Sequence, residues 1–162
     1  MKVLIVSDTH GKNDNLRRVL HKLDGHIDLL IHLGDFLGSP EALQDMAPCP
    51  VEIVRGNCDS ALGGAPIAKL IRIGEHTALI THGHQYGVKY SVETLKEAAR
   101  ENGADIAMYG HTHEPYLSVS SDDVTVLNPG SLSQPRQDGH RPTYMVMTLR
   151  EDGKAEYSLV KL

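Results

Sequence analysis

Five short apolar runs in this sequence are each followed, within a few residues, by side chains that can bind a metal ion. The runs cover residues 3–6, 29–31, 51–54, 78–80 and 106–108. Short apolar runs are typical of buried strands, and in open α/β sheets ligands gather beyond the carboxyl ends of the strands. If these strands lie with their carboxyl ends together, the polar side chains that follow them converge on one small volume.

The side chains that follow the runs form a set of seven oxygen and nitrogen donors. They are Asp8, His10, Asp35, Asn57, His82, His111 and His113. Two divalent cations need about that many protein ligands, and Asp35 could bridge both ions with its two oxygens. A mixture of carboxylate, amide and imidazole favours manganese, iron, zinc, cobalt or nickel over calcium. A polynuclear hydrolytic site is therefore the first hypothesis.

The rest of the chain predicts helices and hairpins around these strands. Apolar residues recur at helical spacing from Leu16 to Leu23, and we expect further helices over 40–46 and 91–102. Hairpins are expected for 70–73 with 77–80 and for 143–149 with 155–160, and a single strand over 124–127. This mixture indicates two packed sheets with helices outside, and the length of 162 residues predicts a single domain, 1–162.

The charge and composition of the chain limit which partners it can bind and where in the cell it is expected. The formal net charge is −5, and no Lys/Arg cluster is denser than Arg17-Arg18, so we expect no strong nucleic-acid binding. Two cysteines, Cys49 and Cys58, are too few for a disulfide framework. We see neither a signal peptide nor a run of the roughly 20 apolar residues that span a bilayer. We therefore expect a cytoplasmic protein without membrane contact.

The motifs that carry the donors resemble those of the calcineurin-like metallophosphoesterases, in the order of that family. The size is similar to that of its small single-domain prokaryotic phosphodiesterases. The matching motifs are Asp8-Thr9-His10, Gly34-Asp35, Gly56-Asn57-Cys58-Asp59, Thr81-His82-Gly83-His84 and Gly110-His111-Thr112-His113. Asn128-Pro129-Gly130-Ser131 also resembles a segment found near the site in this branch, without a defined role.

The resemblance implies a four-layer α/β/β/α sandwich of two mixed β-sheets flanked by helices, and two divalent metal ions. Manganese is our first expectation, with nickel, cobalt, iron or zinc as alternatives. The implied function is hydrolysis of small phosphodiesters by attack of a metal-bridging hydroxide. The ligands implied for the first ion are Asp8, His10, Asp35 and His113, and those for the second are Asp35, Asn57, His82 and His111.

One position departs from the family pattern. Many members carry a histidine after the asparagine, and that histidine is thought to contact the phosphoryl oxygen or to protonate the leaving group. Cys58 stands there in this chain, so either Cys58 or His84 is expected to assist the leaving group. Asn57 is expected to contact a phosphoryl oxygen as well as a metal. Asp59 is a candidate to orient a ligand by hydrogen bonding, weighed against a loop-capping carboxylate. Arg136 is a candidate phosphate clamp, weighed against a solvated surface arginine.

Two other functions stay open on the sequence alone. Some proteins of this fold are non-catalytic protein-interaction scaffolds that have lost ligands, whereas all seven positions are filled here. A nucleotide-specific diesterase or nuclease is the other alternative, and the acidic balance argues against a processive nuclease. A homodimer is expected only because dimers are common among oligomers.

Overall fold

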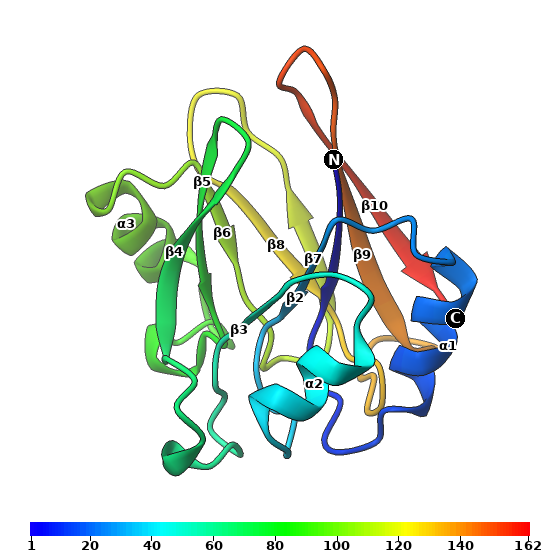
Figure 1. The fold of residues 1–162 in the computed structure, drawn as a ribbon. Helices are drawn as coiled ribbons and strands as arrows, with labels where there is room; N and C mark the ends of the chain where they lie inside the picture. Colours follow the sequence, from blue (N-terminus) through cyan, green and yellow to red (C-terminus); the bar gives the residue numbers. More distant parts are fainter.

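Two five-stranded sheets pack face to face and carry helices on their outer sides (Figure 1). The computed structural model describes residues 1–162, the side chain of Leu62 excepted. The layers run from α1 and α2, through the two sheets, to α3, which confirms the expected α/β/β/α sandwich. The α-helices are α1 (Asp14–Leu23), α2 (Pro40–Met46) and α3 (Glu93–Glu101).

The first sheet has the strand order β10-β9-β1-β2-β3. β1, β2 and β3 are parallel to one another, and the β9–β10 hairpin joins antiparallel to β1. Three carboxyl ends therefore meet at one edge of this sheet. The strands are β1 (Lys2–Val6), β2 (Leu29–His32), β3 (Val51–Ile53), β9 (Thr143–Leu149) and β10 (Ala155–Lys161).

The second sheet has the strand order β4-β5-β6-β8-β7 and the same mixed character. β5, β6 and β8 are parallel, while β4 and β7 are antiparallel edge strands. The strands are β4 (Ala68–Ile73), β5 (His76–Thr81), β6 (Ile106–Met108), β7 (Pro115–Ser118) and β8 (Thr125–Pro129). All five apolar runs thus form strands, as predicted, whereas β7 was not expected from the sequence.

Successive side chains of a central strand point to opposite faces of its sheet. In β1, Val3 and Ile5 face the core between the sheets, and Leu4 and Val6 face the core under α1 and α2. Because both faces are covered, all four side chains are fully buried. A strand buried on both faces is uniformly apolar, which is why the sequence shows a continuous run.

The helices follow the expected apolar spacing, with shifted ends. α1 packs Leu16, Val19 and Leu20 against the first sheet. α3 begins at Glu93, two residues later than expected, and packs Leu95 and Ala99 against the second sheet. Two short 3-10 helices that the sequence did not predict, η1 (Ala61–Gly63) and η2 (His84–Tyr86), lie in loops.

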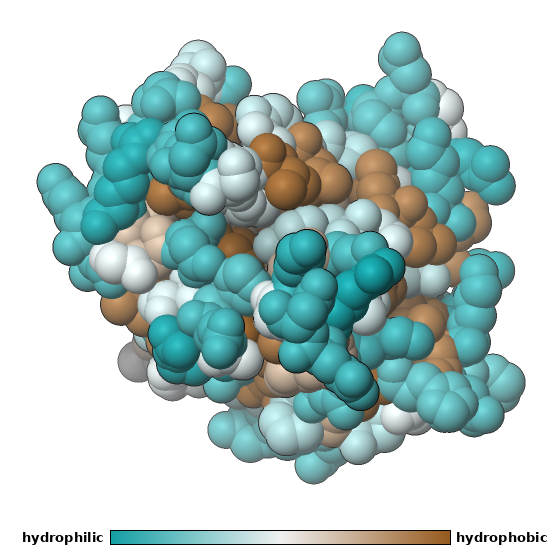
Figure 2. Space-filling model, turned by 90° about the horizontal axis from the view of Figure 1, so that it is seen from above, coloured by the Kyte–Doolittle hydropathy of each residue, from teal (hydrophilic) through white to brown (hydrophobic). Residues whose placement is uncertain are grey.

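The two ends of the sandwich differ in character. The hairpin turns β4–β5 and β9–β10 lie at the end opposite the carboxyl ends of the parallel strands (Figure 1). Hydrophilic residues cover most of that face, with hydrophobic groups showing between them (Figure 2). Within the described part of the chain, no helix has the length and apolarity that crossing a membrane requires.

Candidate metal centre

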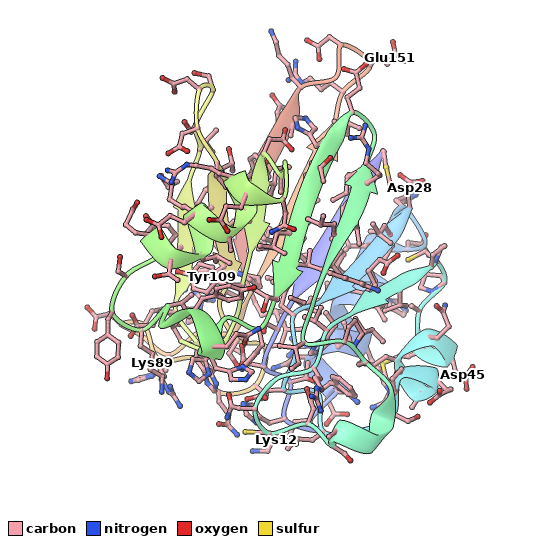
Figure 3. All side chains as sticks on the ribbon, turned by 90° about the vertical axis from the view of Figure 1, so that its left-hand side faces the viewer. Lys12, Asp28, Asp45, Lys89, Tyr109 and Glu151 are labelled. Carbon is pink, nitrogen blue, oxygen red and sulfur yellow. The ribbon has the colours of Figure 1, made fainter. Side chains whose placement is uncertain are left out.

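The loops that leave the parallel strands of both sheets meet at one end of the molecule. Figure 3 shows Lys12 and Lys89 at this end, whereas Asp28 and Glu151 mark the other. Backbone hydrogen bonds join neighbouring loops within each sheet: Asp8 N–H donates to the Gly34 carbonyl in the first, and Gly110 N–H donates to the His82 carbonyl in the second. Between the sheets, Leu132 N–H after β8 donates to the Ser7 carbonyl after β1. The convergence that the strand ends predicted is therefore present.

Asp8, His10 and His113 form one half of the cluster. The Asp8 Oδ1 atom lies 3.1 Å from His113 Nε2 and 3.8 Å from His10 Nε2. The two imidazole Nε2 atoms lie 3.3 Å apart. Their three ligand atoms lie close enough together to hold one ion.

Asp35 stands between that half and His82. The Asp35 Oδ2 atom lies 3.8 Å from His10 Nε2 and 3.4 Å from His82 Nε2. His82 Nε2 in turn lies 4.0 Å from Asp8 Oδ1. Asp8, Asp35 and His82 form a second group that could hold an ion, and all three are buried.

Two atoms of the cluster point to a cation. Asp8 Oδ1 and His82 Nε2 are buried and lack a hydrogen-bond partner among the described residues. Burying a polar atom without a partner is costly, and a bound cation removes that cost. His82 Nδ1 donates to the Leu33 carbonyl at 2.7 Å, and His113 Nδ1 donates to the Gln134 carbonyl at 2.7 Å. These hydrogen bonds direct each Nε2 lone pair into the cluster, as metal-binding histidines require. The donor set therefore fits divalent metal ions.

The other predicted residues surround this cluster. The His111 ring lies 5.0 Å from the His82 ring, and its backbone N–H donates to Asp8 Oδ2. His84 lies 5.6 Å from His82 and 6.0 Å from His111, measured between ring centroids. Asn57 is exposed, and its amide contacts Cys58 Sγ at 3.3 Å. Arg136 is exposed, and its backbone N–H donates to the His113 carbonyl.

The backbone of the site is strained in a way that the sequence did not reveal. Five of the predicted ligands have a positive φ, a conformation that non-glycine residues rarely adopt. They are Asp8, His10, Asp35, His111 and His113, with φ between 46° and 66°. Such strain is found at functional sites, where the surrounding structure must hold it in place.

The segment after β8 holds Asp8 and His113. Ser131 Oγ and Ser133 Oγ both donate to the Asp8 carbonyl, at 2.8 Å and 3.0 Å. Gln134 supplies the carbonyl that orients His113. Sequence reasoning singled out Asn128-Pro129-Gly130-Ser131 without a clear role, and did not identify Ser133 or Gln134.

Asp59 holds the loop that carries Asp35. Its carboxylate accepts hydrogen bonds from the backbone N–H groups of Asp35, Leu37 and Gly56, at 2.7, 2.8 and 2.7 Å. Asp35 Oδ1 accepts a further bond from Cys58 N–H at 2.8 Å. Asp59 therefore ties the loop after β2 to the loop after β3.

The environment shifts the pKa values of the cluster. Burial would raise the pKa of Asp8 and Asp35, but contacts with His113 and His82 outweigh burial and lower both values. Burial lowers the pKa of His111 to about 4, with help from the charges of His82 and Lys89. Burial and the neighbouring Asp35 raise the pKa of Cys58 to about 11. Without a bound ion, both carboxylates are therefore ionised at neutral pH, and the Cys58 thiol keeps its proton.

His32 lies buried behind this site. Its Nδ1 accepts from the Gly34 N–H, so its Nε2 donates to Thr9 Oγ1 at 3.1 Å. Burial lowers the pKa of His32 to about 4, so the ring is neutral at neutral pH. His32 thus supports the loops that carry Asp8 and Asp35.

Comparison with known proteins identifies the class. The chain matches the calcineurin-like phosphoesterase superfamily domain over residues 1–152, and it belongs to this family. A probable metallophosphoesterase of Bacillus subtilis, YsnB, is 34% identical over 154 residues, which are 94% of this chain and 86% of the relative. The phosphodiesterase MJ0936 of Methanocaldococcus jannaschii is 31% identical over 146 residues, which are 80% of this chain and 83% of the relative.

Solved structures share the whole architecture. A conserved uncharacterized protein from Streptococcus pneumoniae, described as a predicted phosphoesterase, has a TM-score of 0.78 at 26% identity, covering 99% of this chain and 97% of its own. Wild-type Vps29 from Entamoeba histolytica, solved with zinc, has a TM-score of 0.76 at 24% identity, covering 99% of each chain. The second likeness concerns the fold alone.

The contact between Gly56 and Asp35 leaves no room for a side chain. A Cβ atom on Gly56 would overlap Asp35 Oδ1 and lie 2.6 Å from Asp35 N. We expect Gly56→Ala to displace Asp35, to lower bound metal in elemental analysis, and to cost about 1–3 kcal/mol of unfolding free energy. Gly38→Ala is the matched control, because its Cβ would meet nothing nearer than Phe36 at 4.0 Å. Equal metal content in the two variants would contradict the steric argument.

Removing the Asp59 carboxylate should loosen the Asp35 loop. We expect Asp59→Asn to weaken metal binding about 10–100-fold in calorimetric titration, because the amide cannot accept three N–H groups as a carboxylate does. The circular dichroism spectrum should not change. Asp45→Asn makes the same chemical change on the exposed face of α2 and should bind metal like the unaltered protein. An unchanged affinity in Asp59→Asn would refute the positioning role.

Proposed function

We propose that this protein is a dinuclear-metal-dependent phosphodiesterase that hydrolyses small phosphodiesters. The proposal depends on one observation, the clustering of two carboxylates and three imidazoles: Asp8, Asp35, His10, His82 and His113. Two atoms of this cluster, Asp8 Oδ1 and His82 Nε2, are buried without a hydrogen-bond partner among the described residues. The first ion would be held by Asp8, His10, Asp35 and His113, and the second by Asp35, Asn57, His82 and His111. Asp35 Oδ2 faces His10 on one side and His82 on the other, which supports its role as the shared ligand.

The ions and the side chains would have different roles in the reaction. Two divalent ions, when bound, would make water nucleophilic near neutral pH and neutralise the charge of the phosphate. The exposed Asn57 amide would bind a phosphoryl oxygen. Either His84 or Cys58 would protonate the leaving alkoxide, and His84 Nδ1 is buried without a partner among the described residues.

Small diesters suit this site better than long nucleic acid. The net charge is −5, so the molecule as a whole does not attract a polyanion. Lys89 is exposed, and its charge acts on His111 at the edge of the cluster. One local cation beside the ions is enough for a single phosphate group. The choice of manganese, the cytoplasmic location and the dimer stay predictions.

A scaffold role is the alternative from another class. A relative in Schizosaccharomyces pombe, vacuolar protein sorting-associated protein 29, is 31% identical over 139 residues. The scaffold hypothesis expects lost ligands, whereas every ligand position is filled in this chain. The complete donor set therefore supports catalysis.

The decisive assay compares a diester with a monoester. We expect the manganese-loaded protein to cleave bis(p-nitrophenyl) phosphate faster than p-nitrophenyl phosphate. Asp35→Asn should lower that rate by orders of magnitude and lower bound metal, because it removes the shared carboxylate, while Asp45→Asn should change neither. Absence of hydrolysis of both esters, with manganese, nickel and cobalt each tested, would defeat the proposal.

Lys89 tests the substrate side of the site. We expect Lys89→Met to raise KM for the diester about tenfold, equivalent to about 1.4 kcal/mol, with a smaller change in kcat. Salt should shrink this difference, because the attraction between Lys89 and the phosphate is screened. Lys154→Met removes a lysine from the β9–β10 turn at the far end and serves as the control. Equal KM values for the two variants would exclude the contact.

A further inference from the structure

Cys58 lies against the outer side of the metal centre. Its Sγ atom, a His10 ring nitrogen and an Asp35 carboxylate oxygen all lie within 4.8 Å of one another, which is close enough for one ion to contact all three. The Cys58 N–H also donates to Asp35 Oδ1 at 2.8 Å. This bond ties the cysteine backbone to the carboxylate and keeps the residue beside the cluster.

The buried carboxylate of Asp8 independently indicates that a cation binds next to His10. Asp8 Oδ1 is fully buried and has no hydrogen-bond partner among the described residues. It lies 3.8 Å from His10 Nε2, a member of the cysteine group. Cys58 Sγ therefore lies beside donor atoms that a bound cation would stabilise.

We propose that Cys58 binds one of the two ions as a thiolate, together with His10 and Asp35. The proposal rests on the metal centre of the proposed function and adds an eighth ligand to it. The sulfur–metal bond would form as the S–H bond breaks, and the proton would pass to solvent, because metal ligands must be deprotonated. Cys58 is exposed while Asp8 and His82 are buried, so the sulfur would close the solvent side of the site.

A sulfur ligand would change which metal ions the site prefers. Thiolates favour zinc, cobalt and iron(II) over manganese and magnesium, whereas the remaining oxygen and nitrogen donors accept all of these ions. Cys58 would thus set the metal preference at the position where many family members carry histidine. A cysteine bound in this way has no proton to give, so protonation of the leaving group would fall to His84.

Cobalt spectroscopy tests the sulfur bond without reference to activity. The full chain is loaded with Co²⁺, its bound cobalt is measured by elemental analysis, and its near-ultraviolet absorption is recorded. We expect a sulfur-to-cobalt charge-transfer band that Cys58→Ser and Cys58→Ala both lose while they still bind cobalt. Cys49→Ala should keep the band, because Cys49 is buried in the core beneath α1 and α2.

Metal competition gives a second measurement. The preference of the protein for zinc over manganese should fall by about tenfold or more in Cys58→Ser. Cobalt bound without the band, or a band of equal intensity in Cys58→Ser, would overturn the proposal. If the band is present but no diester is cleaved, the proposed function is wrong and the proposal that Cys58 binds the ion is supported. If the unaltered protein binds no cobalt, both proposals fail.

Discussion

Two carboxylates buried at the meeting point of the strand ends determine how the rest of the site is built. Asp8 is 0% exposed and Asp35 is 2% exposed. A buried charge is tolerated only where hydrogen bonds and opposite charge compensate it. The backbone N–H of His111 supplies a bond to Asp8, and that of Cys58 supplies one to Asp35. Asp8 Oδ1 has no hydrogen-bond partner among the described residues, so a bound cation would supply the rest of the compensation. The carboxylates, the histidines and the loops therefore form one interdependent unit.

The loops take strained conformations to bring these groups together, and residues outside the proposed donor set hold those conformations in place. Each left-handed non-glycine residue costs on the order of 1 kcal/mol. Ser131 and Ser133 fix the carbonyl of Asp8, and Asp59 fixes the backbone around Asp35. The donors and their supports come from loops far apart in the chain. The site therefore depends on the whole sandwich rather than on any one motif.

The central strands, and the clustering of polar side chains at their ends, were predictable because they depend on local pattern. A strand buried on both faces, such as β1, is an apolar run in the sequence, and a donor after it lies at the strand end. The edge strand β7 was missed because its residues are mostly exposed and follow no apolar run. Asp59 was only a candidate to orient a ligand, because its three N–H partners become neighbours when the chain folds. The positive φ values have the same tertiary origin.

The donors are drawn from both sheets, with Asp8, His10 and Asp35 on one side and His82, His111 and His113 on the other. An ion bound among them would therefore act as a cross-link between the two halves of the sandwich. A ligand that binds the native state alone stabilises it in proportion to the logarithm of its concentration. Occupancy and folding are then thermodynamically linked, so the melting temperature would report the supply of metal.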